Sequence, residues 1–300
     1  MKNVFTHIYQ RTHEGYLLFY DFIDYLVYFT ILCVVTPRYN IKILTMCQMP
    51  DHLHIGVVAE RSRAIAALMR DTSMWYSRYG QAPQMKRGIL FDERHYGCAI
   101  KASDKKARTT IIYIGNNPVE RKLVTRAEKY QWNYLAYAIS KNPFSEKLII
   151  RKASKQLKKA IDEVKSTYSM DHPLSNSQMR RLFFKLDTKE RLQLIDYIIT
   201  IYSVIDYDAA ISFFGRYDKM IGAMYYNTGS EYDLKEAFVG RSDTCYLEID
   251  SWLLKNLRLK DIHDVFLMED EKRASLLLEV YRSTGVNLRQ IAKFLRLKVE

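Results

Sequence analysis

The sequence predicts an α+β protein whose N-terminal half forms a sheet covered by helices. Two observations support this. Short segments rich in β-branched and aromatic residues alternate with longer segments of helical periodicity, and their order is β-α-β-β-α-β-α. That order, with two helices against one antiparallel sheet, is typical of a ferredoxin-like core. A third observation concerns the rest of the chain: after Asn142-Pro143 the strand patterns stop, which predicts an all-α C-terminal region.

Each N-terminal element follows from a local pattern. Strands are predicted where β-forming residues alternate with polar ones, and helices where apolar residues recur every three or four positions. Proline disfavours helical geometry in itself and in the residue before it, so Pro37 should stop the first helix and Pro118 the last. The predicted elements are strand 4–11, helix 16–35, strands 41–48 and 52–58, helix 61–79, strand 89–100 and helix 105–117.

The second half is predicted to be mostly helical, with a loop at 174–181 and loops with short helices at 215–240. Residues 146–167 form a basic amphipathic pattern, 188–214 an apolar one, and the chain is helical from residue 250. Segments 269–283 and 288–295 flank a turn containing Gly285, which is the layout of a helix-turn-helix. Its second helix would present Arg289, Gln290 and Lys293 to DNA, although two such helices often only pack together. We divide the chain into residues 1–143, 144–249 and 250–300.

The charge predicts an anionic partner. The 300 residues carry a net charge of +12, with a pI near 9.3. Residues 84–159 hold 18 Lys or Arg against 6 Asp or Glu, an excess equal to the net charge of the whole chain. Nucleic acid is the leading partner for such a charge and a membrane surface the second, while a solvated basic face is the structural alternative.

Composition also bears on the compartment. The four cysteines show no CxxC spacing, which argues against a zinc knuckle or a disulfide framework and fits a reducing cytoplasm. No signal peptide is recognisable. The most apolar run, residues 22–35, contains Asp24 and is too short to span a bilayer, so it predicts a buried helix and no membrane partner.

One short stretch carries the candidate chemistry. His52 and His54 lie two residues apart on a predicted strand, so their imidazoles share one face and form a ready pair of metal ligands. Tyr113 and Asn117 lie four residues apart on a predicted helix and also share a face. If that helix covers the histidine face of the sheet, all four groups converge.

This set of groups has a specific chemistry. Two neutral imidazoles and an amide oxygen can hold a divalent cation, which would polarise a phosphodiester. An activated tyrosine can attack phosphorus and form a covalent phosphotyrosine. Each element alone has a structural explanation: the histidines can be packing residues, Tyr113 is one of 23 tyrosines, and Asn117 can cap or turn the chain before Pro118.

In combination these residues carry a resemblance to a known family. The histidine stretch resembles the His-hydrophobic-His (HUH) motif of the single-tyrosine transposases, in Met49-Pro50-Asp51-His52-Leu53-His54. The tyrosine region is similar to that of the REP-associated tyrosine transposases, in Tyr113-Ile114-Gly115-Asn116-Asn117-Pro118-Val119 and Tyr130-Gln131-Trp132-Asn133-Tyr134. A Gly-x-Leu-Phe strand of that branch has its counterpart in Gly88-Ile89-Leu90-Phe91, and the resemblance covers residues 4–137.

The resemblance implies a ferredoxin-like HUH nuclease core that cuts and rejoins single-stranded DNA, often beside a hairpin. It implies that His52, His54 and Asn117 bind Mg²⁺ or Mn²⁺ and that Tyr113 is the nucleophile. Asp51 stands where asparagine is common, a difference we expect to be harmless. Such enzymes act as monomers or as dimers that exchange helices, so a homodimer stays open, and we expect a cytoplasmic, nucleoid-associated protein.

Phosphate contacts are expected from the basic residues on either side of Tyr113. These are Lys101, Lys105, Lys106, Arg108, Arg121, Lys122 and Arg126. Two other functions remain open: a non-catalytic DNA-binding regulator on the same fold, and an RNA-directed nuclease or binder.

Overall fold

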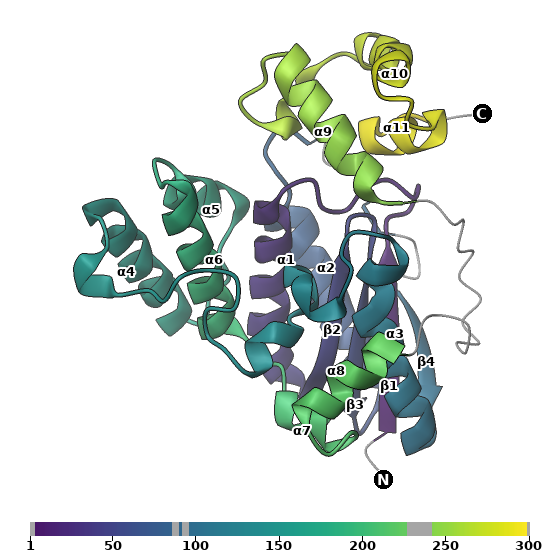
Figure 1. Cartoon of the computed structure of the whole chain (residues 1–300), viewed down its shortest axis with the longest axis vertical. Helices are drawn as coiled ribbons and strands as arrows, with labels where there is room; N and C mark the ends of the chain where they lie inside the picture. Colours follow the sequence, from purple (N-terminus) through teal and green to yellow (C-terminus); the bar gives the residue numbers. More distant parts are fainter. Residues whose placement is uncertain (1–3, 86–89, 92–95, 227–241, 299–300) are drawn as a thin grey trace.

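The structure is a computed structural model that describes residues 4–85, 90–91, 96–226 and 242–298 (Figure 1). It confirms the predicted α+β class. A four-stranded antiparallel sheet has the order β2-β3-β1-β4, and its strands are β1 (Val4–Arg11), β2 (Ile41–Met49), β3 (His52–Ala59) and β4 (Gly97–Lys101). The connectivity is β-α-β-β-α-β, which is that of ferredoxin-like folds.

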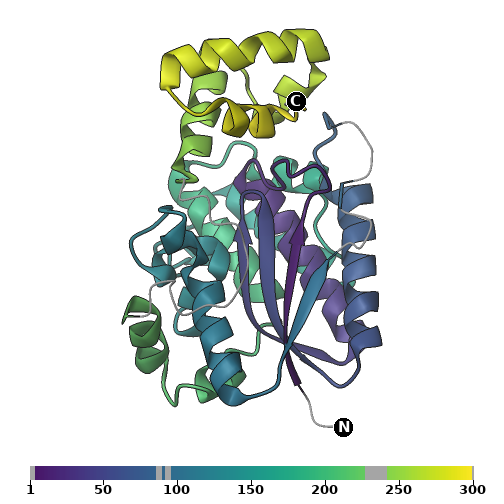
Figure 2. The same cartoon turned by 90° about the vertical axis from the view of Figure 1, so that its right-hand side faces the viewer.

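Helices cover both faces of the sheet, as Figure 2 shows. On one face, the odd-numbered residues of β3 (Leu53, Ile55 and Val57) share a core with α1 (Phe22–Val35) and α2 (Ser62–Trp75). The opposite face lies under α3 (Asp104–Glu120), which contacts β2 and β3. Successive strand residues point to opposite faces, so His52 and His54 lie on the α3 side.

Helix α1 is the central element of the core. It begins at Phe22 rather than residue 16, because the Asp21 carboxylate caps it by accepting hydrogen bonds from the backbone N–H groups of Ile23 and Asp24. The segment Phe22–Tyr39 is long and apolar enough to cross a membrane by composition, but 72% of it is buried inside the fold. The segment therefore has the burial of a core helix.

Helix α3 corrects one prediction. It does not end at Asn117 but runs through Pro118 to Glu120, and the backbone N–H of Arg121 still bonds to the Asn117 carbonyl. A proline in the last turn removes one helical hydrogen bond, and burial of the turn from Ile114 to Pro118 offsets that loss. Strand β4 is also shorter than predicted, with Phe91 forming an isolated bridge to Thr12; residues 89 and 92–95 of the predicted strand lie outside the described residues.

The second half is mostly helical, as predicted, with shifted ends. One prediction was wrong: in the predicted loop 174–181 a helix begins at Asn176, where the Ser175 side chain caps it. The basic helix predicted at 146–167 begins at Lys155, where the Ser154 side chain caps it. The helices are α4 (Lys155–Ser169), α5 (Asn176–Phe183), α6 (Thr188–Tyr202), α7 (Tyr207–Ser212), α8 (Tyr217–Tyr226), α9 (Thr244–Asn256), α10 (Asp270–Thr284) and α11 (Leu288–Leu295). Short turns of 3₁₀ helix occur at Thr36–Tyr39, Ala127–Lys129, Gln131–Asn133, Leu135–Ala138, Ile150–Lys152 and Ile262–Leu267, and one π-helical turn at Tyr76–Gly80.

These helices pack around the sheet in three places. Helices α5 and α6 contact α1 and belong to the same hydrophobic core as the sheet. Helices α7 and α8 share a core with α3. Helices α9, α10 and α11 enclose a separate core and form a C-terminal unit, residues 242–298, at the end of the sheet (Figures 1 and 2). The predicted division at residue 249 falls inside α9.

Candidate active site

The two histidines of the strand motif lie side by side beneath α3. The ring centroids of His52 and His54 are 4.9 Å apart in an edge-to-face arrangement, and both side chains are buried. Leu53 between them points to the opposite core. The structure therefore brings these two imidazoles together as the strand pattern predicted.

His54 is bonded at both ring nitrogens. Its Nδ1 lies 3.0 Å from His7 Nε2, and its Nε2 lies 3.0 Å from Asn117 Nδ2. An amide nitrogen only donates, so the His54 Nε2 accepts and its Nδ1 carries the proton that His7 accepts. Burial, followed by the charges of His52 and His7, lowers the pKa of His54 well below its usual value. The ring is therefore neutral at pH 7.

His7 is a member of the site that sequence reasoning missed. It lies on β1 opposite Gly56, one step diagonally from His54, on the same face of the sheet. Burial, followed by the charge of Lys101, lowers the pKa of His7 to about 4. The alternation in strand 4–11 could have indicated part of this, because it places His7 on one face with Tyr9 and Arg11. It does not show that this strand pairs with the strand that carries His54.

The two ring nitrogens of His52 differ in their surroundings. Its Nδ1 lies 2.5 Å from Asp51 Oδ1, while its Nε2 is buried without a hydrogen-bond partner among the described residues. Burial alone would raise the pKa of Asp51, but the charges and hydrogen bonds of His52 and Lys293 hold it well below its usual value. An ionised carboxylate only accepts, so the Nδ1 of His52 carries a proton; in the neutral ring the lone pair then lies on Nε2.

Tyr113 and Asn117 reach the site from α3. The Ser103 side chain caps this helix by accepting from the backbone N–H of Lys106. The Tyr113 ring packs edge-to-face on His54, with centroids 5.3 Å apart, and on His7 at 5.9 Å. The spacing of four residues thus places both side chains on the sheet side of the helix, and Tyr113 is only 5% exposed.

This donor set fits a divalent cation. The buried Nε2 of His52 lacks a partner among the described residues, and the Nε2 of His54 lies beside the Asn117 amide. A half-turn of the Asn117 amide about its last side-chain bond would bring its oxygen to the place that the amide nitrogen now occupies. Two imidazole nitrogens and an amide oxygen are ligands that Mn²⁺ and Mg²⁺ accept.

The basic residues around Tyr113 divide into exposed and engaged groups. Lys105, Lys106 and Arg108 are exposed on the first turns of α3, Lys122 is exposed after its end, and Lys101 is half-buried on β4. Two others make ion pairs within the chain. Arg121 lies 3.6 Å from Asp243, and Arg126 lies 2.6 Å from Glu128.

The polar side of α11 is turned partly toward the rest of the protein. Arg289 is exposed, but the Gln290 side-chain amide donates to the Ser242 carbonyl at 3.4 Å. The Lys293 ammonium pairs with Asp51 next to His52. The predicted second helix of the helix-turn-helix therefore contacts the site directly.

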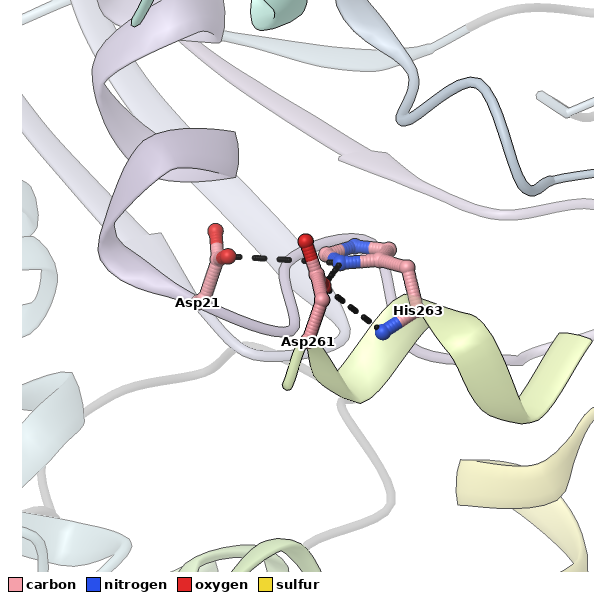
Figure 3. A group of neighbouring side chains, drawn as sticks. All are labelled: Asp21, Asp261 and His263. Atoms are coloured by element: carbon pink, nitrogen blue, oxygen red, sulfur yellow. Dashed lines mark hydrogen bonds and ion pairs between the residues drawn. The ribbon is translucent and has the colours of Figure 1, made fainter. Parts of the chain in front are cut away.

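A second cluster of ligand-type side chains lies at the N-terminal end of α1. Figure 3 shows Asp21 and Asp261 both facing the ring of His263, whose Nδ1 lies 2.9 Å from Asp261 Oδ1. The Nε2 of His263 lies 3.0 Å from Asp24 Oδ2, and the Arg180 guanidinium pairs with both Asp21 and Asp261.

This cluster has the chemistry of an ion-pair network. Burial would lower the pKa of His263, but the charge of Asp24 and hydrogen bonds to Asp24 and Asp261 outweigh it and raise the pKa to about 10. A protonated imidazole donates at both nitrogens and has no lone pair for a metal. The network instead joins the start of α1, helix α5 and the C-terminal unit.

No family model and no curated protein matches the chain. A solved structure described as a REP-associated tyrosine transposase bound to a REP hairpin is similar to it, with 12% sequence identity and a TM-score of 0.38. The similarity covers 46% of this chain and 81% of that one. A score of that size does not establish a shared fold, so the chemistry of the site has to follow from its own side chains.

Proposed function

We propose that this protein is a metal-dependent DNA strand transferase that cuts and rejoins single-stranded DNA beside a hairpin. The observation that supports the proposal is the convergence beneath α3 of three features: the buried His52 Nε2, which has no partner among the described residues, the His54–Asn117 pair and the Tyr113 ring. A protein that only binds DNA has no need for this combination of groups.

His52, His54 and Asn117 would hold Mg²⁺ or Mn²⁺. When bound, the cation polarises the phosphodiester and offsets the charge that develops on its oxygens. The Tyr113 oxygen bonds to phosphorus as the bond between phosphorus and one sugar oxygen breaks; the phenol loses a proton and the leaving oxygen gains one. The phosphotyrosine retains the bond energy, so a second strand end is joined without a nucleotide cofactor.

The DNA strand would lie along the start of α3. Lys105, Lys106 and Arg108 are exposed there, and they would contact phosphates together with Lys101, Arg121, Lys122 and Arg126. If the α10–α11 pair acts as a helix-turn-helix, Arg289 is its exposed cation. Gln290 and Lys293 would have to leave their present partners to reach DNA.

The test uses labelled single-stranded hairpin DNA with Mg²⁺ or Mn²⁺. We expect cleavage and a denaturant-resistant protein–DNA adduct, both lost in Tyr113→Phe and without metal. Tyr79→Phe, an exposed tyrosine outside the site, is the matched control and should form the adduct at the wild-type level.

A second candidate function is a DNA-binding regulator without catalysis. The observation that favours it is the burial of Tyr113, His52 and His54, which are 5%, 7% and 0% exposed. Tight binding with no cleavage or adduct, over several hairpins and both metals, would support the regulator and contradict the transferase.

A further inference from the structure

We infer that Lys293 on α11 acts through Asp51 as a positioning residue for His52, so that the C-terminal unit completes the candidate metal site. The inference rests on the proposed function, since it concerns the same site. It assigns to the second half of the chain a role in holding the metal ligands rather than in reading DNA sequence.

The geometry is a continuous chain of three side chains. Asp51 lies in the turn between β2 and β3, and its two carboxylate oxygens face in different directions. Oδ1 lies 2.5 Å from His52 Nδ1, and Oδ2 accepts from the Lys293 ammonium. All three side chains are largely withdrawn from water, at 12%, 10% and 27% exposure for Asp51, His52 and Lys293.

A carboxylate that bonds a ligating histidine fixes the ring orientation and its tautomer. Here the Asp51 carboxylate keeps the proton on His52 Nδ1 and leaves Nε2 for the metal. The Lys293 ammonium stabilises the Asp51 carboxylate in this position. Without it, the buried Oδ2 of Asp51 would lack its cation and would still lie near a second carboxylate, that of Asp243. Burial and then the charge of Asp51 raise the pKa of this neighbour, Asp243, to about 6, and Arg121 opposes the effect.

Lys293 is itself held by a packed element. Helix α11 buries Ile291, Phe294 and Leu295 in the core of the C-terminal unit. The Tyr20 hydroxyl donates to the Phe294 carbonyl at 3.0 Å, which ties the helix to the segment before α1. The ammonium is thus presented to Asp51 from a fixed position, as a positioning residue requires.

The experiment titrates the full-length protein with Mn²⁺ alone by calorimetry, so that it does not depend on cleavage. We expect Lys293→Met and Asp51→Asn each to weaken Mn²⁺ binding about tenfold, the lower end of the range for partners of metal ligands. Lys293→Arg should restore most of the affinity, and the double variant should be no weaker than Asp51→Asn. Lys272→Met, which removes an exposed charge from α10, is the matched control.

A second readout separates positioning from a loss of folding. In metal-free protein labelled with ¹⁵N-histidine, we expect wild-type His52 as the Nδ1–H tautomer, and a shift toward Nε2–H in Lys293→Met with the other histidine signals unchanged. Wild-type Mn²⁺ affinity and an unchanged tautomer in folded Lys293→Met would overturn the inference. So would increased cleavage at unchanged affinity, because Lys293 would then cover the site rather than build it.

The two proposals can fail separately. Loss of metal affinity in Lys293→Met, with no adduct from the wild-type protein, would support the positioning role and contradict the strand transferase. An adduct that depends on Tyr113, with unchanged Mn²⁺ affinity in Lys293→Met, would support the strand transferase and contradict the positioning role of Lys293. A wild-type protein that binds no Mn²⁺ would overturn both.

Discussion

At the scale of single residues, protonation in the site is set by a row of buried hydrogen bonds. His7, His54 and Asn117 form one line, in which the amide donates to the His54 Nε2 and the His54 Nδ1 donates to His7. Burial lowers the pKa of both imidazoles, so both rings are neutral at pH 7. A neutral imidazole has one nitrogen that carries a proton and one that carries a lone pair. Because the Asn117 amide donates to His54 Nε2, the His54 proton lies on Nδ1. His7 accepts that proton in a hydrogen bond and so holds the His54 ring in place.

Replacement of His7 by phenylalanine should therefore weaken the metal site. His7→Phe leaves the His54 Nδ1 proton without its acceptor, and we expect at least tenfold weaker Mn²⁺ binding and a loss of about 1–3 kcal/mol of stability. His7→Gln offers a side-chain oxygen in the same region, so it should retain more Mn²⁺ affinity and more stability than His7→Phe. Calorimetric Mn²⁺ titration and thermal melting of the two variants measure the difference, and equal affinities would show that His7 only fills space.

At the scale of elements, α3 combines a charged, exposed start with a buried end. Its first turns carry Lys105, Lys106 and Arg108 in water, and its last turns carry Tyr113 and Asn117 against the sheet. Under the proposed function, one helix would thus connect the phosphate contacts to Tyr113, and a strand bound along its start would lead toward the site.

The salt dependence of DNA binding tests this arrangement. Lys105→Gln and Lys106→Gln should each weaken binding to single-stranded DNA and reduce the slope of log K against log salt by about 0.7. Lys165→Gln, on the exposed side of α4, removes the same charge and should leave the slope unchanged. Fluorescence anisotropy at several salt concentrations measures these slopes. Equal slopes in all three variants would contradict a DNA strand bound along the start of α3.

Prediction from sequence succeeded where the signal was local. The bounds of β1 and the helix pair α10–α11 followed from periodicity and from Gly285, whose φ of +69° suits the turn between those helices. The end of α3 was missed, because burial of the Pro118 turn is a tertiary effect. The contact of Lys293 with Asp51 joins residues 242 positions apart, and no local pattern encodes such a pair.

Asp51, which stands where asparagine is common in the resembled family, has two contacts that the sequence did not predict. In the structure the carboxylate accepts from His52 and Lys293 together. An asparagine has one oxygen rather than two, so it cannot accept both hydrogen bonds through separate oxygens.

At the scale of the whole molecule, a buried ion-pair network joins three parts of the chain. His263 from the C-terminal unit, Arg180 from α5 and the acids at the start of α1 meet in one place. The raised pKa of His263, about 10 against an ordinary 6.5, means that the folded protein binds this proton more tightly than the unfolded chain does. By linkage, stability must fall as pH rises over that interval.

We expect the contribution of His263 to stability to be fully present below pH 6.5 and lost as pH rises through about 10. His263→Gln leaves the buried Asp24 without its cation, which should cost about 3–5 kcal/mol at pH 6 and much less near pH 10. Urea unfolding of both proteins at pH 6, 8 and 10 measures this. A constant difference between the two proteins across that range would contradict the charged pair.

The same network has a consequence for the order of events during synthesis. The Asp24 side chain is buried near the start of α1, whereas its partner His263 lies 239 residues further along the chain. All four strands of the described sheet are therefore synthesised well before His263, whose cation pairs with the Asp24 carboxylate. Before residue 263 is synthesised, Asp24 can accept hydrogen bonds from the Tyr20 N–H and the Asn176 amide but lacks the His263 cation. We therefore expect the C-terminal unit to dock after the rest of the core has formed.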